Sequence, residues 1–91
     1  MADAEPLAII AGGGPMPLHV AAAAEKSGRP VLIIGLEGEA DTGVAAFRHK
    51  WLNWGQIGSL PKIIGAHGAR DVVLIGSIKA RPDFKRLKLD L

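Results

Sequence analysis

Apolar residues of this chain gather in short unbroken runs. Three of these runs cover residues 7–11, 30–36 and 71–77 ("LAIIA", "PVLIIGL" and "DVVLIGS"). A short run without polar alternation is typical of a strand that is covered on both faces of a sheet. A fourth segment, residues 47–54 ("FRHKWLNW"), mixes aromatic and polar residues and predicts a weaker strand nearer a sheet edge.

Two helices are predicted between these strands. Pro17 stands where a helix can begin without an N–H group, and Gly28 is placed to end that helix. Residues 55–68 ("GQIGSLPKIIGAHG") predict a second helix, in which Pro61 fits only the first turn. Residues 37–46 are predicted to form a loop with at most one helical turn.

The order strand, helix, strand, loop, strand, helix, strand is typical of a parallel, doubly wound sheet. Because crossovers are right-handed, we expect a three-layer α/β fold. It would be a small Rossmann-like parallel sheet of about four strands in the order 3-2-1-4, with helices on both faces. Residues 1–78 would form this domain. Residues 79–91 would be a basic segment that leads toward a further C-terminal domain, although its charge also fits a solvated tail.

The amino-acid composition indicates a small globular domain and excludes several other classes of protein. The chain has 91 residues, of which 48% are hydrophobic and 22% are charged, as in one small globular domain. The absence of cysteine excludes disulfides and thiolate metal sites, and fits a cytoplasmic location. The sequence contains neither an apolar run of the ~20 residues that a membrane helix needs nor a secretory signal. A net charge of +2 does not indicate nucleic acid as a partner.

Glycine-rich stretches follow three of the predicted strands. They are Gly12–Gly14 after the first, Gly55–Gly58 after the third and Gly76 after the fourth. Ligands of open α/β sheets bind outside the carboxyl ends of the strands, and amides at a helix N-terminus attract anions. We therefore expect these stretches to approach a phosphate group. The alternative is that the glycines only permit tight turns.

Known nucleotide motifs fit this region incompletely. If Gly12 is the first glycine of G-x-G-x-x-G, Pro17 occupies the third position, where a proline ring prevents close helix–strand packing. No Walker lysine follows the glycines. Glu37 or Glu39 stands at a suitable distance for a ribose contact, so a nucleotide ligand stays open.

Catalytic chemistry is not visible in the pattern. The three histidines lack metal-ligand spacing, and no serine stands in a G-x-S-x-G elbow. Glu37, Glu39 and Asp41 could together hold Mg²⁺, but a solvated loop explains them as well. We therefore assign no catalytic residue and no metal ligand.

Four blocks of the sequence resemble one protein family across the whole chain. They are "IIAGGGPMP", "GRPVLIIGLEGEAD", a tryptophan followed by "GQIG", and "DVVLIGSIKARPD". In this order and spacing they are similar to the N-terminal domain of the LpxI family. Its members are UDP-2,3-diacylglucosamine pyrophosphatases of lipid A biosynthesis in Gram-negative bacteria.

The resemblance implies an activity for a longer protein. Members hydrolyse UDP-2,3-diacylglucosamine to UMP and 2,3-diacylglucosamine 1-phosphate with a divalent metal such as Mg²⁺, and the substrate lies between two domains. The acidic residues that hold the metal belong to the second domain, so the 91-residue chain alone is expected to be inactive. A lipid substrate is compatible with peripheral contact at the inner membrane, and a homo-oligomer is also compatible.

The resemblance also implies candidate substrate contacts, which are the residues that match the glycine-rich, "GQIG" and "K/R-x-R-P" blocks. An alternative function is a stand-alone, non-catalytic nucleotide- or sugar-phosphate-binding module. A third interpretation is a structural half-domain whose glycines only form turns. The candidate contacts are Gly12, Gly13, Gly14, Gly55, Gln56, Gly58, Gly76, Lys79 and Arg81.

Overall fold

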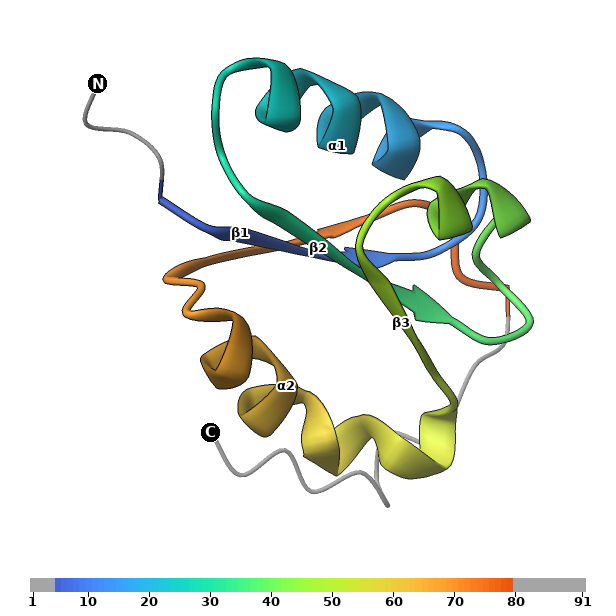
Figure 1. Cartoon of the computed structure of the whole chain (residues 1–91). Coiled ribbons are helices and arrows are strands. Elements are labelled where there is room, and N and C mark those ends of the chain that lie inside the picture. The colour runs from blue at the N-terminus through green and yellow to red at the C-terminus, as the bar shows by residue number, and fades with distance from the viewer. Residues whose placement is uncertain (1–4, 80–91) are drawn as a thin grey trace.

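Four parallel strands form one sheet in the computed structural model, which describes residues 5–79 (Figure 1). The strands lie in the order β3-β2-β1-β4, so the first strand of the chain is central. This confirms the predicted parallel α/β fold and its strand order. The strands are β1 (Leu7–Ala11), β2 (Val31–Leu36), β3 (His49–Leu52) and β4 (Asp71–Ile75).

One helix covers each face of the sheet (Figure 1). Helix α1 (Met16–Lys26) follows β1, and helix α2 (Leu60–His67) precedes β4. Two 3-10 segments, η1 (Thr42–Ala46) and η2 (Trp54–Ser59), flank β3. The second helix is therefore shorter than the predicted 55–68, because residues 55–59 form part of η2 instead. Its end is as predicted, since Gly68 adopts the left-handed conformation with φ of 76°.

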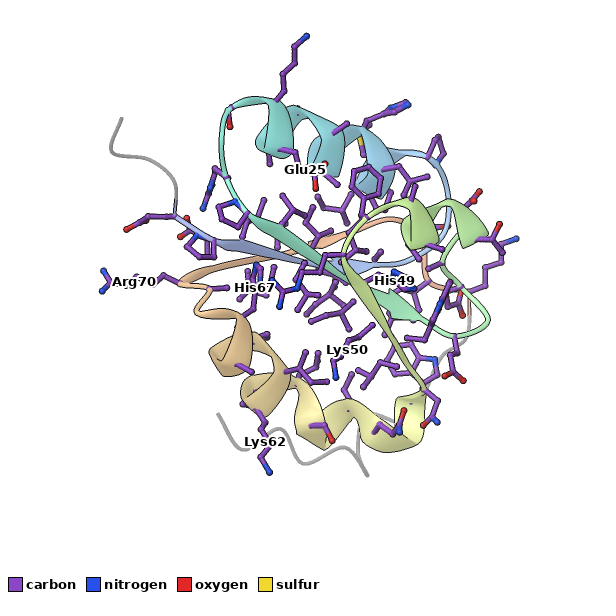
Figure 2. All side chains as sticks on the ribbon, viewed as in Figure 1. Glu25, His49, Lys50, Lys62, His67 and Arg70 are labelled. Atoms are coloured by element: carbon purple, nitrogen blue, oxygen red, sulfur yellow. The ribbon has the colours of Figure 1, made fainter. Side chains whose placement is uncertain are left out.

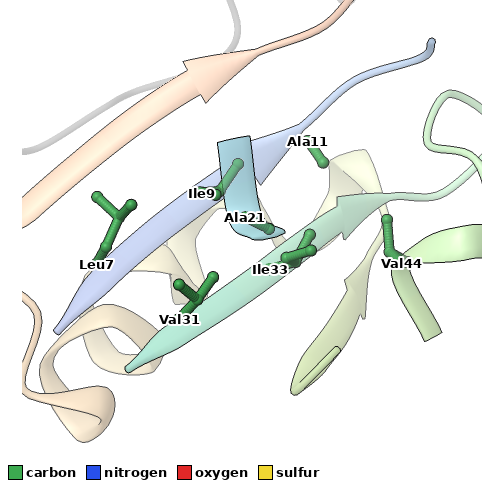
Figure 3. Packing of buried hydrophobic residues seen from close by; sticks show 7 residues of the cluster. All are labelled: Leu7, Ile9, Ala11, Ala21, Val31, Ile33 and Val44. Atoms are coloured by element: carbon green, nitrogen blue, oxygen red, sulfur yellow. The ribbon is translucent and has the colours of Figure 1, made fainter. Parts of the chain in front are cut away.

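The core between α1 and the sheet comes from alternate residues of β1 and β2 (Figure 3). Alternation arises because successive strand side chains point to opposite faces. Ala21 is fully buried on the sheet side of α1, and its small side chain lets the helix lie close to the strands. Val44 of η1 completes this layer. The cluster consists of Leu7, Ile9, Ala11, Ala21, Val31, Ile33 and Val44.

The other alternate residues form a second core on the α2 side of the sheet. Its buried members are Leu32, Ile34 and Leu36 of β2 with Leu52 of β3. Apolar residues of η2 and α2 pack against them. Unbroken apolar runs therefore arise because β1 and β2 are covered on both faces, as the sequence pattern predicts. The packing residues of η2 and α2 are Trp54, Ile57, Leu60, Ile63 and Ile64.

Strand β4 departs from this pattern. The prediction that it is buried is wrong, because Val72 is 42% exposed and Leu74 is 60% exposed. Both side chains lie on the α2 face by alternation with Ile75, which packs against the α1-side core. Helix α2 packs over the opposite part of the sheet, so within the described residues 5–79 it leaves this strand uncovered.

Candidate functional site

The carboxyl ends of all four strands meet at one edge of the sheet, because every pairing is parallel. This edge is called the glycine edge below and consists of residues 12–16, 37–41, 53–58 and 76–79. The three predicted glycine stretches therefore do lie at the same end of the sheet. The hydrogen bonds and the packing of each stretch decide whether its backbone amides can contact a ligand.

The first two glycines hydrogen-bond to the chain segment that follows β4. The N–H of Gly12 donates to the carbonyl of Ile75 at 2.8 Å, and the N–H of Gly13 donates to the carbonyl of Ser77 at 2.7 Å. Ser77 returns a bond from its own N–H to the carbonyl of Gly13 at 3.0 Å. These two amides are used within the protein, and a phosphate would have to displace a backbone carbonyl to reach them.

Close backbone packing explains why side chains are absent here. A Cβ atom on Gly12 would lie 2.5 Å from the carbonyl oxygen of Ser77, and one on Gly13 would lie 2.8 Å from that of Glu39. Gly76 combines a left-handed φ of 109° with a Cβ position 2.7 Å from the carbonyl carbon of Gly12. The turn interpretation therefore accounts for these three glycines, whether or not a ligand also binds nearby.

Two amides remain at the beginning of α1. Pro15 and Pro17 have no N–H group, which leaves Gly14 and Met16 as the donors that can face outward. In the part of the chain that the structure describes, neither N–H is used in a backbone bond. Gly14 has a left-handed φ of 92°, and no atom lies within 4 Å of a Cβ placed there. An anion at this edge would therefore meet two donors at a helix N-terminus.

The "GQIG" stretch forms a separate part of the edge. It lies in η2, after β3, and β3 is two strand positions from β1, or about 10 Å. The side-chain oxygen of Gln56 accepts from the N–H of Asn53 at 3.1 Å, so a ligand would meet the NH₂ group of the same carboxamide. Gly55 and Gly58 are exposed, and Ile57 packs into the α2-side core.

Glu39 links two loops of the glycine edge, a role that its position in the sequence did not indicate. Its side-chain oxygen accepts from the backbone N–H of Lys79 at 2.9 Å, while its carbonyl lies against Gly13. The bond holds the residues after β4 next to the loop after β2. Lys79 itself is exposed. Arg81, the other basic candidate, lies outside the described residues.

The acidic loop does not form a metal centre. Asp41 uses a carboxylate oxygen to accept from the N–H of Gly43 at 2.7 Å, and Glu39 is bonded to Lys79. Across residues 5–79, no three His, Asp or Glu side chains lie close enough to hold one ion. The described residues therefore do not provide the set of side-chain ligands that holds a divalent metal.

Comparison with known proteins assigns the chain to a specific family. A family model described as the LpxI N-terminal domain matches residues 6–91. The chain belongs to the LpxI family. This confirms the resemblance of its four sequence blocks.

A curated LpxI relative gives the scale of the match. The UDP-2,3-diacylglucosamine pyrophosphatase LpxI of Caulobacter vibrioides is 33% identical over 84 residues. The alignment covers 92% of this chain and 30% of the relative, so the chain spans about a third of that protein's length. The glycine edge falls inside the region that the LpxI family model matches. Within residues 5–79, no helix has the length and apolar character that crossing a bilayer requires.

Proposed function

We propose that this LpxI-family chain is the N-terminal substrate-binding domain of a UDP-2,3-diacylglucosamine pyrophosphatase. The reaction would hydrolyse UDP-2,3-diacylglucosamine to UMP and 2,3-diacylglucosamine 1-phosphate. The observation that carries the proposal is the family match over residues 6–91. The relative from Caulobacter vibrioides, which is named for this activity, supports it.

The glycine edge is the surface that would contact the UDP part of the substrate. The amides of Gly14 and Met16 lie at the N-terminus of α1, where the helix dipole adds about 0.3–1 kcal/mol for an anion. Lys79 brings a positive charge to the same edge. The carboxamide of Gln56 would form the far side of the site, by donating to a phosphate or to the uracil ring.

Metal binding and bond cleavage would belong to the part of the protein beyond this chain. Across residues 5–79, no three acidic or histidine side chains cluster as metal ligands would, so this domain would bind and orient the substrate. We therefore expect no hydrolysis by the 91-residue chain alone. UMP release by that chain, lost on addition of a chelator, would contradict this division of labour.

The test uses the full-length enzyme and measures UMP release from UDP-2,3-diacylglucosamine. Gln56→Ala and Lys79→Ala should each raise KM by about three- to tenfold, as expected when one polar contact is lost. The matched control is Lys26→Ala, which removes an exposed lysine at the other end of α1 and should leave KM unchanged.

Unfolding curves accompany the kinetics, because Gln56 also accepts a backbone hydrogen bond. An unchanged KM in both folded variants would place the substrate elsewhere. The second candidate function, a stand-alone nucleotide- or sugar-phosphate-binding module, is favoured only by the lack of a metal-holding group in the described residues. Binding of UDP to a full-length protein that does not hydrolyse the substrate would support that module instead.

A further inference from the structure

A hollow lies at the opposite end of the sheet from the glycine edge. It is a cleft of about 270 Å³ between strand β3 and helix α2, and Leu32, Ile63 and Ala66 provide its apolar surface. Leu32 is near the beginning of β2, and the β3 residues of the cleft are at the beginning of that strand. The cleft is therefore at the amino ends of the strands and is separate from the site proposed above.

Positive side chains surround this cleft. Lys50 lines it from β3, Arg48 lines it from the residue just before that strand, and Lys62 lines it from α2. Lys50 lies on the α2 face, because it is two positions from Leu52 and pairs with Ile34, and both of these are buried in the α2-side core. No Asp or Glu lines the cleft, and across residues 5–79 none of the three cations is ion-paired. We name it the basic cleft.

Figure 2 shows how three of the side chains around the basic cleft lie. Lys50 lies between β3 and α2, whereas Lys62 points outward from α2 and forms the rim. His67 lies between α2 and the sheet, with its Nε2 atom 3.4 Å from the carbonyl of Pro30. Arg48 and Lys50 come from the residue before β3 and from the beginning of that strand, so an occupant would meet these two cations on the same side of the cleft.

We propose that the basic cleft binds a small organic phosphate. Its phosphate would bond to the guanidinium of Arg48 and the ammonium of Lys50, and its apolar part would cover Leu32 and Ile63. Three unpaired like charges around one hollow repel one another, and an anion relieves that repulsion. A guanidinium also suits a phosphate in a bidentate arrangement. The volume is just below the roughly 300–1,000 Å³ of drug-sized sites, which favours a ligand smaller than a nucleotide sugar.

An alternative explanation of Arg48 and Lys50 is that their charges protect the sheet edge from pairing with another chain. Lysine and arginine on an edge strand prevent pairing with a second chain, and β3 is such a strand. That role requires charge along β3 alone. It explains neither Lys62, which comes from α2, nor the apolar residues at the base of the hollow. A phosphate site predicts saturable binding of a small anion in the cleft, whereas edge protection predicts none.

The test titrates the 91-residue chain with phenyl phosphate and follows backbone amide signals by NMR. We expect saturable shifts at residues 48–50 and 62–67, and the same shifts with weaker affinity for inorganic phosphate. Benzyl alcohol, which lacks the charge, should cause no saturable shift. The signals of Gly14 and Met16 report separately on the glycine edge, so this result does not depend on the function proposed for that edge.

Variants assign the binding to particular side chains. Arg48→Gln and Lys50→Gln should each weaken phenyl phosphate binding about tenfold, since each removes a charge-assisted hydrogen bond. Lys62→Gln, at the rim, should weaken it less. Lys26→Gln is the matched control, because it removes an exposed lysine from α1 on the other face of the sheet and should change nothing. Dispersed amide spectra confirm that each variant is folded.

Three outcomes would overturn the proposal. The first is an absence of saturable shifts in the folded chain. The second is equal weakening by Lys26→Gln, which would show that the shifts follow total charge. The third is binding only to vesicles that contain phosphatidic acid, with no response to phenyl phosphate, which would make the basic surface a membrane contact.

Discussion

At Gly12, one added carbon atom is expected to disturb the joint between β1 and β4. A Cβ atom there would lie 2.5 Å from the carbonyl oxygen of Ser77, so the paired backbones must move apart. We predict that Gly12→Ala lowers the free energy of unfolding by about 1–3 kcal/mol, as other overpacked sites do. Gly58→Ala is the control, since no atom lies within 4 Å of its Cβ position, and its effect should be near zero. Urea unfolding measures both, and equal effects would refute the packing argument.

The same glycines show what the sequence could predict of the candidate site. Their position after the strands predicts that they share one edge, and the structure confirms this. The sequence could not indicate that the amides of Gly12 and Gly13 bond to residues 75–77, because that pairing joins segments about 60 positions apart. The link from Glu39 to Lys79 was missed for the same reason. Which of these residues touch a substrate stays a prediction.

Helix α1 depends on small residues for its distance from the sheet. Ala21 is fully buried among the side chains of β1 and β2, whereas Ala22 is exposed. We predict that Ala21→Leu lowers the free energy of unfolding by about 1–3 kcal/mol, because the larger side chain pushes the helix outward. Ala22→Leu should stay within about 0.5 kcal/mol of the original chain. Thermal unfolding with the two variants side by side tests this, and a neutral Ala21→Leu would show that the layer is loosely packed.

Elements whose ends are marked by glycine were predicted well, and features set by long-range packing were not. The bounds of β1 agree with the structure because "LAIIA" is followed directly by glycines. Residues 55–59 were assigned to the second helix, but they form η2, where Gln56 bonds back to Asn53. The exposure of β4 could not be predicted, since its apolar run looks like that of a central strand. What covers a strand is decided by where the helices pack.

On the scale of the whole molecule, apolar exposure is concentrated at β4. Val72 and Leu74 face outward on an edge strand, an arrangement that favours pairing between chains. We predict that the 91-residue chain self-associates as its concentration rises, and that Leu74→Lys suppresses this. The thermal midpoint should hardly change, because Leu74 is already 60% exposed. Light scattering measures the association, and equal scattering by both chains would show that β4 is not the contact.

The central place of β1 also has a consequence for the growing chain. After β1 has left the ribosome, β2 pairs with one side of it, but its other partner, β4, begins about 60 residues after β1 ends. At roughly 5–20 residues per second, synthesis leaves that side of β1 open for several seconds. The backbone N–H and C=O groups on that side of β1 are then available to other chains or to chaperones. Slow codons between β1 and β4 would lengthen this interval, whereas a circular permutation that begins at β4 would shorten it.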